Sequence, residues 1–126
     1  MESLFYGCSS LKDLDISHFS TVSLMSMKSM FYNCNSLENL KLPIINIENG
    51  ILDTESMFYE CSSLKSVNIS SVYTLNLHST EKMFYNNRNL STLILPKVNT
   101  YWVTSMNGMF YHCESLTSLN LSNLDT

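Results

Sequence analysis

Hydrophobic and polar positions along the 126-residue chain recur with a period of 26 or 27 residues. The clearest marker is a Phe-Tyr pair that returns at intervals of 26, 27, 26 and 26 residues: Phe5-Tyr6, Phe31-Tyr32, Phe58-Tyr59, Phe84-Tyr85 and Phe110-Tyr111. Three residues after each Phe stand, in chain order, Cys8, Cys34, Cys61, Asn87 and Cys113. A fixed period of this length is typical of stacked structural repeats, in which each unit buries its apolar side only against its neighbours.

Within each unit the spacing of apolar positions changes from helical to extended. Residues 106–113 carry Met, Met, Phe and Cys at i, i+3, i+4 and i+7, the spacing of one face of a helix about two turns long. Residues 116–121 carry Leu at their first, fourth and sixth positions, and the last two alternate as in a short strand. Residues 98–103 predict a third, extended segment because they begin and end on β-branched Val.

One unit departs from the common length. The second unit has one extra residue between Ile47 and Ile51, at Gly50, and we predict a surface bulge there. An inward-facing column is expected at Leu24, Ile51, Leu77 and Val103. Pro43 and Pro96 each stand one residue after the last inward Leu of a predicted strand, where they can end a ladder of hydrogen bonds.

The unit Met-x-x-Met-Phe-Tyr-x-Cys-x-Ser-Leu-x-x-Leu-x-Leu resembles the BspA-like leucine-rich repeats, in particular their subtype of about 26 residues. The resemblance covers essentially the whole chain. Members of that family are mostly surface or secreted proteins of bacteria and some protists, and several are adhesins or bind host proteins. The resemblance therefore implies a surface-displayed or secreted binding protein, and it brings no catalytic motif with it.

We therefore predict an α/β repeat fold: a right-handed leucine-rich-repeat solenoid with a parallel β-sheet on one side and short helices or turns on the other. A single domain would span residues 1–126 in about five coils, numbered here 1 to 5 in chain order: 1–26, 27–53, 54–79, 80–105 and the incomplete 106–126. Both ends fall inside the repeat and carry no polar cap. We therefore expect a fragment of a longer array that can associate end to end with other copies.

Composition limits the classes of partner that the chain is expected to bind. Hydrophobic residues make up 44% of the chain, enough for a core, whereas charged residues make up 14% and the net charge is −4. Lys and Arg are scattered singly, which argues against nucleic acid or an anionic membrane as the main partner. No stretch approaches the roughly 20 apolar residues of a membrane span, so membrane insertion is not expected. No signal peptide is visible at the N-terminus.

The residues that could carry chemistry are cysteine and histidine, and their spacing does not favour a reactive site. The four Cys include no C-x-x-C pair, so a zinc site is not indicated, and their shared inward position predicts a buried ladder of free thiols. A disulfide between adjacent coils and a metal site are the alternatives. Asn87 should bend or hydrate its coil unless its amide finds backbone partners. Since His18, His78 and His112 occupy different columns, we predict no enzyme, catalytic residue, metal or cofactor.

The outward positions of the predicted strands form the first candidate binding face. They are Asp13, Asp15, Asn39, Lys41, Ser66, Asn68, Thr92, Ile94, Ser118 and Asn120. This face is the usual ligand platform of a solenoid, and its Ser, Asn and Thr fit hydrogen bonding to a protein or a glycan. The same composition equally fits a solvated sheet without a ligand.

Aromatic residues form two further candidates. The tyrosine of each Phe-Tyr pair follows a buried Phe, so the Tyr column is either a contact surface or a cover for the edge of the predicted helix. Tyr101 and Trp102 are aromatic, whereas the matching pairs Val22-Ser23 and Leu75-Asn76 are not. We include Tyr101 and Trp102 in the candidate binding face because exposed Trp is typical of binding hot spots.

These patterns predict a non-catalytic interaction module that binds protein or glycan. The location at the cell surface or outside the cell, and the adhesin-like role, follow from the family resemblance. The alternative is an intracellular interaction scaffold or effector fragment.

Overall fold

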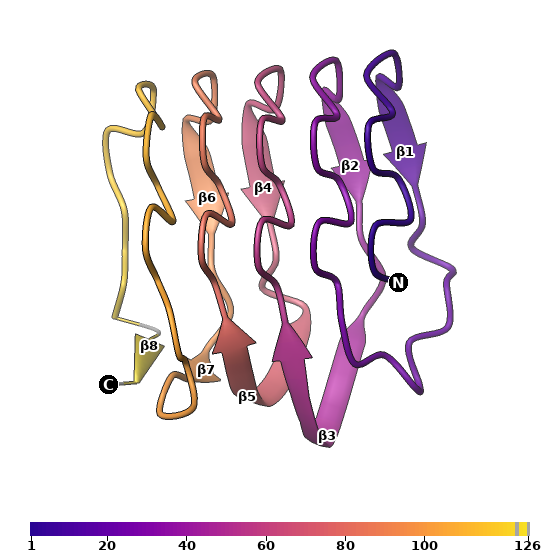
Figure 1. The fold of residues 1–126 in the computed structure, drawn as a ribbon, viewed down its shortest axis with the longest axis vertical. Helices are drawn as coiled ribbons and strands as arrows, with labels where there is room; N and C mark the ends of the chain where they lie inside the picture. Colours follow the sequence, from indigo (N-terminus) through magenta and orange to yellow (C-terminus); the bar gives the residue numbers. More distant parts are fainter. Residues whose placement is uncertain (123, 126) are drawn as a thin grey trace.

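The computed structural model describes residues 1–122, 124 and 125, and for residues 48, 49, 74, 75, 98, 124 and 125 it describes the backbone alone. Asn123 and Thr126 of the predicted fifth coil lie outside the described residues. The backbone runs through a row of similar coils that lie side by side, and the two termini lie at opposite ends of the row (Figure 1). Short strands occupy the upper half of the coils in this view, and a second group of strands lies at their lower end.

The strands form four parallel pairs. On the upper side β1 (Asp13–Asp15) pairs with β2 (Asn39–Lys41), and β4 (Ser66–Asn68) pairs with β6 (Thr92–Ile94). At the lower end β3 (Ile45–Asp53) pairs with β5 (Val72–Ser79), and β7 (Val98–Asn99) pairs with β8 (Leu124–Asp125). Parallel strands in repeating coils fit the expected repeat fold. The expectation of one continuous sheet is wrong, because β2 and β4 belong to separate two-stranded sheets.

Each pair of successive coils is joined by one of the four ladders. The β1–β2 ladder joins coils 1 and 2, β3–β5 joins coils 2 and 3, β4–β6 joins coils 3 and 4, and β7–β8 joins coils 4 and 5. The ladders therefore alternate between the upper side and the lower end along the row (Figure 1).

A local sequence difference between odd and even coils explains this alternation. In coil 3 the backbone N–H and hydroxyl of Ser70 donate to Asn68 Oδ1 at 3.0 and 2.7 Å, a turn in which the side-chain oxygen replaces a backbone acceptor. The chain then curls, and Val72 donates its N–H locally to Ile69 O at 3.0 Å. Coil 1 repeats both features.

Even coils carry proline where odd coils carry this serine. Pro43 has no N–H to donate, so the serine-type turn cannot form, and coil 2 stays extended beyond it. Ile45 then donates its N–H to Ser71 O of coil 3 at 3.0 Å, which begins the β3–β5 ladder. Pro96 precedes β7 in coil 4 in the same way. The two prolines thus direct the chain to the ladder at the lower end of the molecule.

The side of the coils opposite to the short strands consists of tight turns, and the predicted helices are absent from the part of the chain that the structure describes. Each coil has two residues of positive φ in this region, at Ser3, Gly7, Ser29, Asn33, Ser56, Glu60, Lys82, Asn86, Gly108 and His112. Such left-handed residues cannot continue a right-handed helix. The prediction of turns is confirmed, and the prediction of helices is wrong.

Hydrogen bonds explain why these turns imitate the helical spacing. In coil 2, Tyr32 donates its N–H to Ser29 O at 3.1 Å within the coil, whereas Phe31 donates to Met57 O of coil 3 at 2.9 Å. Successive N–H groups thus donate in turn to a carbonyl of the same coil, which closes a local turn, and to a carbonyl of the next coil. Successive turns of three residues place Met27, Met30, Phe31 and Cys34 on one side, all of them buried. The i, i+3, i+4, i+7 pattern is therefore shared by a helix and by this chain of turns.

The core consists of residue columns that run through the stack. The Phe rings of successive coils are parallel to within 13°, with centroids 5.6, 5.3, 5.3 and 5.9 Å apart. Phe31, Phe58 and Phe84 are fully buried, whereas Phe5 and Phe110 in the outer coils are partly buried. The predicted vertical register of like residues is confirmed for this column.

The predicted position of Ile51 in the inward Leu column is wrong. Ile51 is 48% exposed, and Leu52 takes the buried place and pairs with Leu77. The β3–β5 register shifts between Ile47 and Ile51, which is where the extra residue of coil 2 was predicted to bulge. Gly50 allows this path, because a Cβ there would lie 2.5 Å from Ile47 Cγ2. The added residue thus turns Ile51 outward.

We predict that Phe58→Ala lowers the free energy of unfolding by about 3–5 kcal/mol, because the cavity would lie between two stacked rings in the middle of the column. Urea unfolding monitored by circular dichroism measures the change. The matched control is Phe5→Ala in the outermost coil, which loses one stacking neighbour and should cost less. Equal losses in the two variants would contradict a core built by stacking.

Candidate interaction surfaces

The outward strand residues form an exposed platform on the upper side of the coils. The outward residues of β1, β2, β4 and β6 are all exposed, and so are Ser118 and Asn120, which lie in coil 5 outside any strand. The residues between them, such as Val67, point inward and are partly or fully buried. Since β2 and β4 are not paired, the platform consists of two separate halves.

The half of the platform on β1 and β2 is charged and internally bonded. Asn39 Nδ2 donates to Asp13 Oδ1 at 2.5 Å, and Lys41 Nζ lies 3.1 Å from Asp15 Oδ2. The hydroxyl and the N–H of Ser17, with Lys41, lower the pKa of Asp15 to about 2, so this carboxylate stays ionised. These polar groups already have partners within the chain, and a ligand would have to compete with them.

The half of the platform on β4 and β6 is neutral. Ser66 lies beside Thr92, and Asn68 lies beside Ile94, which is 47% exposed. The side-chain oxygen of Asn68 is held by Ser70, as described above. This half therefore offers hydroxyl and amide groups around an exposed apolar side chain without a charge in the strands.

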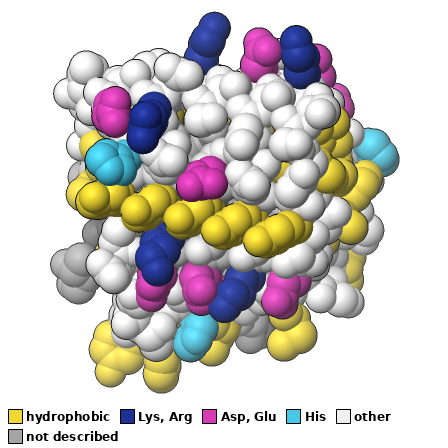
Figure 2. All heavy atoms as spheres, turned by 45° about the horizontal axis from the view of Figure 1, so that its top comes forward, with side chains coloured by type: hydrophobic (Ala, Val, Ile, Leu, Met, Phe, Trp, Pro, Cys, Tyr) yellow, Lys and Arg dark blue, Asp and Glu magenta, His cyan; other side chains and the backbone are white. Residues whose placement is uncertain are grey.

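The tyrosine column is a stack whose ring faces cover one another. Successive rings are parallel to within 17°, and their centroids lie 4.7, 4.4, 4.8 and 4.8 Å apart. Tyr32, Tyr59 and Tyr85 are half-buried, whereas the outer Tyr6 and Tyr111 are exposed. A row of hydrophobic side chains of this kind crosses the face in Figure 2, with charged side chains on both sides of it.

This geometry favours the structural interpretation of the tyrosines. A sugar or an aromatic ligand stacks on the face of a ring, and the neighbouring tyrosines already occupy the inner faces. Burial raises the pKa of Tyr32 and Tyr85, and the adjacent tyrosines raise it further, so the phenols stay neutral. The column therefore offers ring edges and hydroxyl groups to a partner.

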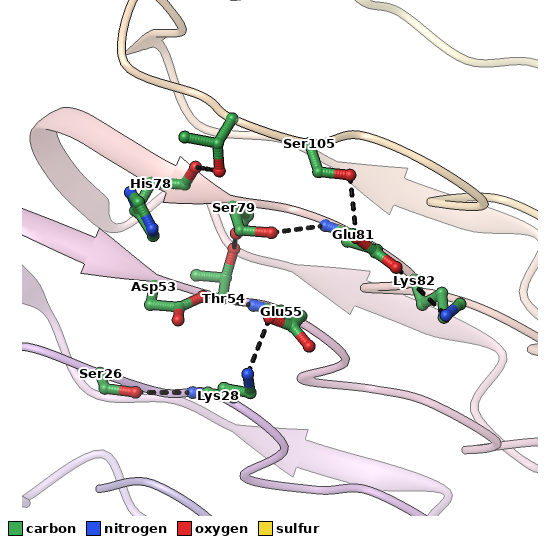
Figure 3. A network of polar contacts seen from close by, with 11 residues as sticks. Ser26, Lys28, Asp53, Thr54, Glu55, His78, Ser79, Glu81, Lys82 and Ser105 are labelled. Atoms are coloured by element: carbon green, nitrogen blue, oxygen red, sulfur yellow. Dashed lines mark hydrogen bonds and ion pairs between the residues drawn. The ribbon is translucent and has the colours of Figure 1, made fainter.

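A polar network that the sequence did not predict lies at the start of the turns (Figure 3). Lys28 Nζ donates to Glu55 Oε2 at 2.8 Å, and Ser105 Oγ donates to Glu81 Oε2 at 3.0 Å. Ser79 Oγ accepts the N–H of Glu81 at 3.2 Å. The signal in the sequence is a Ser or Asp whose side-chain oxygen accepts the N–H two residues later, and it occurs at Ser26, Asp53, Ser79 and Ser105. The network orders the backbone at the start of the turns, and it pairs the charges of Lys28 and Glu55 within the protein.

The cysteine column is a ladder of thiols bonded to backbone. Cys34, Cys61 and Cys113 each donate Sγ–H to the carbonyl of the Phe in the preceding coil, at 3.1, 3.0 and 3.1 Å. Burial raises the pKa of Cys34 to about 11 and raises that of Cys61 and Cys113 as well, so the thiolate is disfavoured. All four cysteines are free thiols in the structure.

Asn87 takes the place of the thiol in coil 4. Its Nδ2 donates to Phe58 O at 2.6 Å and to Tyr85 O at 3.3 Å, so the amide finds the backbone partners that the sequence analysis required. Its Oδ1 is buried without a hydrogen-bond partner among the described atoms. The substitution thus keeps the donor of the column and adds an unsatisfied acceptor.

Histidines and acidic residues do not converge. Among the residues that the structure describes, no group of three or more His, Cys, Asp or Glu is placed to hold a metal ion. His18 contacts the ring of Phe19 edge-on, and His112 lies 3.6 Å from Glu114. In the described part of the chain there is also no helix long and apolar enough to cross a bilayer.

Tyr101 and Trp102 lie on a different surface from the strand platform. They follow β7 at the lower end of coil 4, whereas β6 lies in the upper half (Figure 1). The two rings meet edge-to-face at 5.1 Å and are 78% and 54% exposed. The N–H of Tyr101 donates to Asn99 Oδ1 at 2.7 Å, which holds the turn. The face predicted from sequence is therefore two surfaces, one polar and one aromatic.

Stacked coils, parallel strand pairs and Leu and Phe columns together define a leucine-rich repeat protein. The family described as "BspA type Leucine rich repeat region (6 copies)" matches residues 1–106 and again residues 28–126, and the chain belongs to this family. Leucine-rich repeats of this kind are protein-interaction modules, generally without catalysis, and the family is often surface-associated. No curated protein and no solved structure matches the chain.

We predict that Asn87→Cys raises the free energy of unfolding by about 1–2 kcal/mol, because it removes the unsatisfied Oδ1 and restores the thiol donor to Phe58 O. Urea unfolding measures the change. The reverse substitution Cys61→Asn, in the adjacent coil, is the matched control and should destabilise. A neutral or destabilising Asn87→Cys would show that Oδ1 is satisfied in solution.

Proposed function

We propose that this chain is a non-catalytic protein-binding domain whose ligand contacts the neutral half of the strand platform. The supporting observation is the composition of that half, where Ser66, Asn68, Thr92 and Ile94 stand exposed on a paired and therefore ordered ladder. Apolar contact flanked by hydroxyl and amide groups suits a protein surface, in which an apolar centre is surrounded by polar groups. The charged half on β1 and β2 would serve as the rim.

We further propose display at the cell surface or secretion, with an adhesin-like role. Family membership supports this location, because the family is often surface-associated. A glycan ligand is the less favoured form of the proposal, since the stacked tyrosines leave only their outermost ring faces for sugars. An intracellular scaffold is the alternative, and genomic sequence upstream and downstream of this region distinguishes the two by a secretion signal or an anchor.

The overall architecture that we propose is a single right-handed solenoid over residues 1–126. Parallel strands joined by a crossover are right-handed in nearly all proteins, which supports this hand. End-to-end association of copies is part of the proposal. The N–H groups of Gly108, Phe110 and His112 have no acceptor among the described residues, although their counterparts in earlier coils donate to the next coil. A second copy could supply those acceptors.

We predict that the combined variant Asn68→Ala, Thr92→Ala and Ile94→Ala weakens a protein ligand selected on a host-protein array by about 30-fold or more, about 2 kcal/mol. Surface plasmon resonance measures the affinity, and a glycan array run in parallel tests the sugar alternative. The matched control is Asp13→Ala with Asn39→Ala, on the charged half, which should change affinity little. Unchanged affinity in the triple variant would reject this half of the platform as the binding face.

A further inference from the structure

One long strand has an edge without a neighbouring strand on the side of coil 1. β3 of coil 2 forms its ladder with β5 of coil 3. The corresponding segment of coil 1, residues 19–26, contains no strand, and its only bridge to β3 joins Ser26 and Asp53. In Figure 1 this segment of coil 1 swings away from β3 at the lower end of the molecule.

The backbone of Asn46 faces this open edge. Ile45 donates its N–H to Ser71 O on the β5 side. Successive residues of a parallel strand direct their N–H and C=O groups to alternate edges, so those of Asn46 point toward coil 1. Outside the strand ladders, no backbone hydrogen bond joins either group to coil 1 among the described residues. Unpaired backbone groups at a strand edge are a template for another strand.

Two hydrogen bonds between coil 1 and coil 2 lie at the two ends of this edge. Thr21 Oγ1 donates to Ile44 O at 3.0 Å at one end, and Asp53 donates its N–H to Met25 O at 3.4 Å at the other. Between these contacts lies an open groove of about 540 Å³. The described residues that line the groove carry no charge, and they are Thr21, Val22, Ser23, Leu24, Met25, Asn46, Ile47 and Gly50.

Two of the lining residues are apolar and largely exposed to solvent. Val22 is 91% exposed and Met25 77%. Ile44, whose carbonyl accepts the Thr21 hydroxyl, is 69% exposed. Exposed apolar side chains beside an open strand edge are typical of an interaction site. This site is separate from the platform on β4 and β6.

We propose that this groove binds an extended polypeptide segment of a partner protein, which adds a strand to the open edge of β3. The peptide backbone would pair with the N–H and C=O of Asn46, and its alternate side chains would pack against Val22 and Met25. A polypeptide fits better than a glycan, because only a strand supplies backbone groups and apolar side chains in alternation. The proposal rests on the protein-binding role proposed above but uses a second surface.

The experiment uses the full 126-residue chain and the synthetic peptide Val-Tyr-Thr-Leu-Asn-Leu-His-Ser, the sequence of β5, which already pairs with β3 on its other edge. Fluorescence anisotropy of the labelled peptide measures binding. Asn46→Pro removes the N–H that faces the groove and should weaken binding by about 10-fold or more. Asn46→Ala keeps this N–H and should bind within about twofold of the wild type. A peptide N-methylated at alternate residues should not bind.

Any of four outcomes would overturn the proposal. In the first the peptide does not bind, and in the second it binds equally to wild type and Asn46→Pro, while circular dichroism shows both folded. In the third, sedimentation velocity shows a dimer that Asn46→Pro converts to monomer, which would make a second copy the occupant. In the fourth, Thr92→Ala abolishes peptide binding, which would place the peptide on the platform. A negative result in this experiment would not affect the ligand that the host-protein array selects for the platform. The two proposals are therefore tested separately.

Discussion

The interaction on which the rest of the structure depends is the backbone hydrogen bond from one coil to the next on the turn side. Phe5, Phe31, Phe58 and Phe84 donate their N–H groups to a Met carbonyl of the following coil, each at 2.9 Å. Two left-handed residues per coil make this arrangement possible, because they turn alternate N–H groups out of the coil. These hydrogen bonds hold each coil beside the next at the distance that separates paired β-strands. Because equivalent residues are then in register, like side chains stack on one another.

Stacking then determines which surfaces remain for binding. The aromatic columns use their own ring faces as contacts, so the Phe column is core and the Tyr column is largely a structural edge. The cysteine column and the network around Glu81 satisfy their polar groups within the stack. The surfaces that remain available to a partner lie where neighbouring coils differ. They are the neutral strands β4 and β6, the turn that carries Trp102, and the open edge of β3.

The sequence predicted which positions repeat, but it predicted neither the backbone conformation of the turns nor the points at which coils differ. The 26-residue period was enough to predict the Phe and Cys columns, because identical residues at fixed spacing can be buried together only by stacking. It could not separate helix from turns, since three-residue turns place Met27, Met30 and Phe31 on one side as a helix would. The exposure of Ile51 depends on how β3 absorbs its extra residue, which no pattern records. The exposed platform positions could be read from alternation, but the separation of Trp102 from them needed the path of the chain.

The alternation of proline and serine turns sets the unit in which such an array can grow. Coils that carry Pro43 or Pro96 pair at the lower end with the coil that follows, and coils with the Asp15 or Asn68 turn pair on the upper side. Insertion or loss of a single coil would place two coils of one kind next to each other and remove a ladder. Gene duplication that preserves every ladder must therefore copy coils in twos.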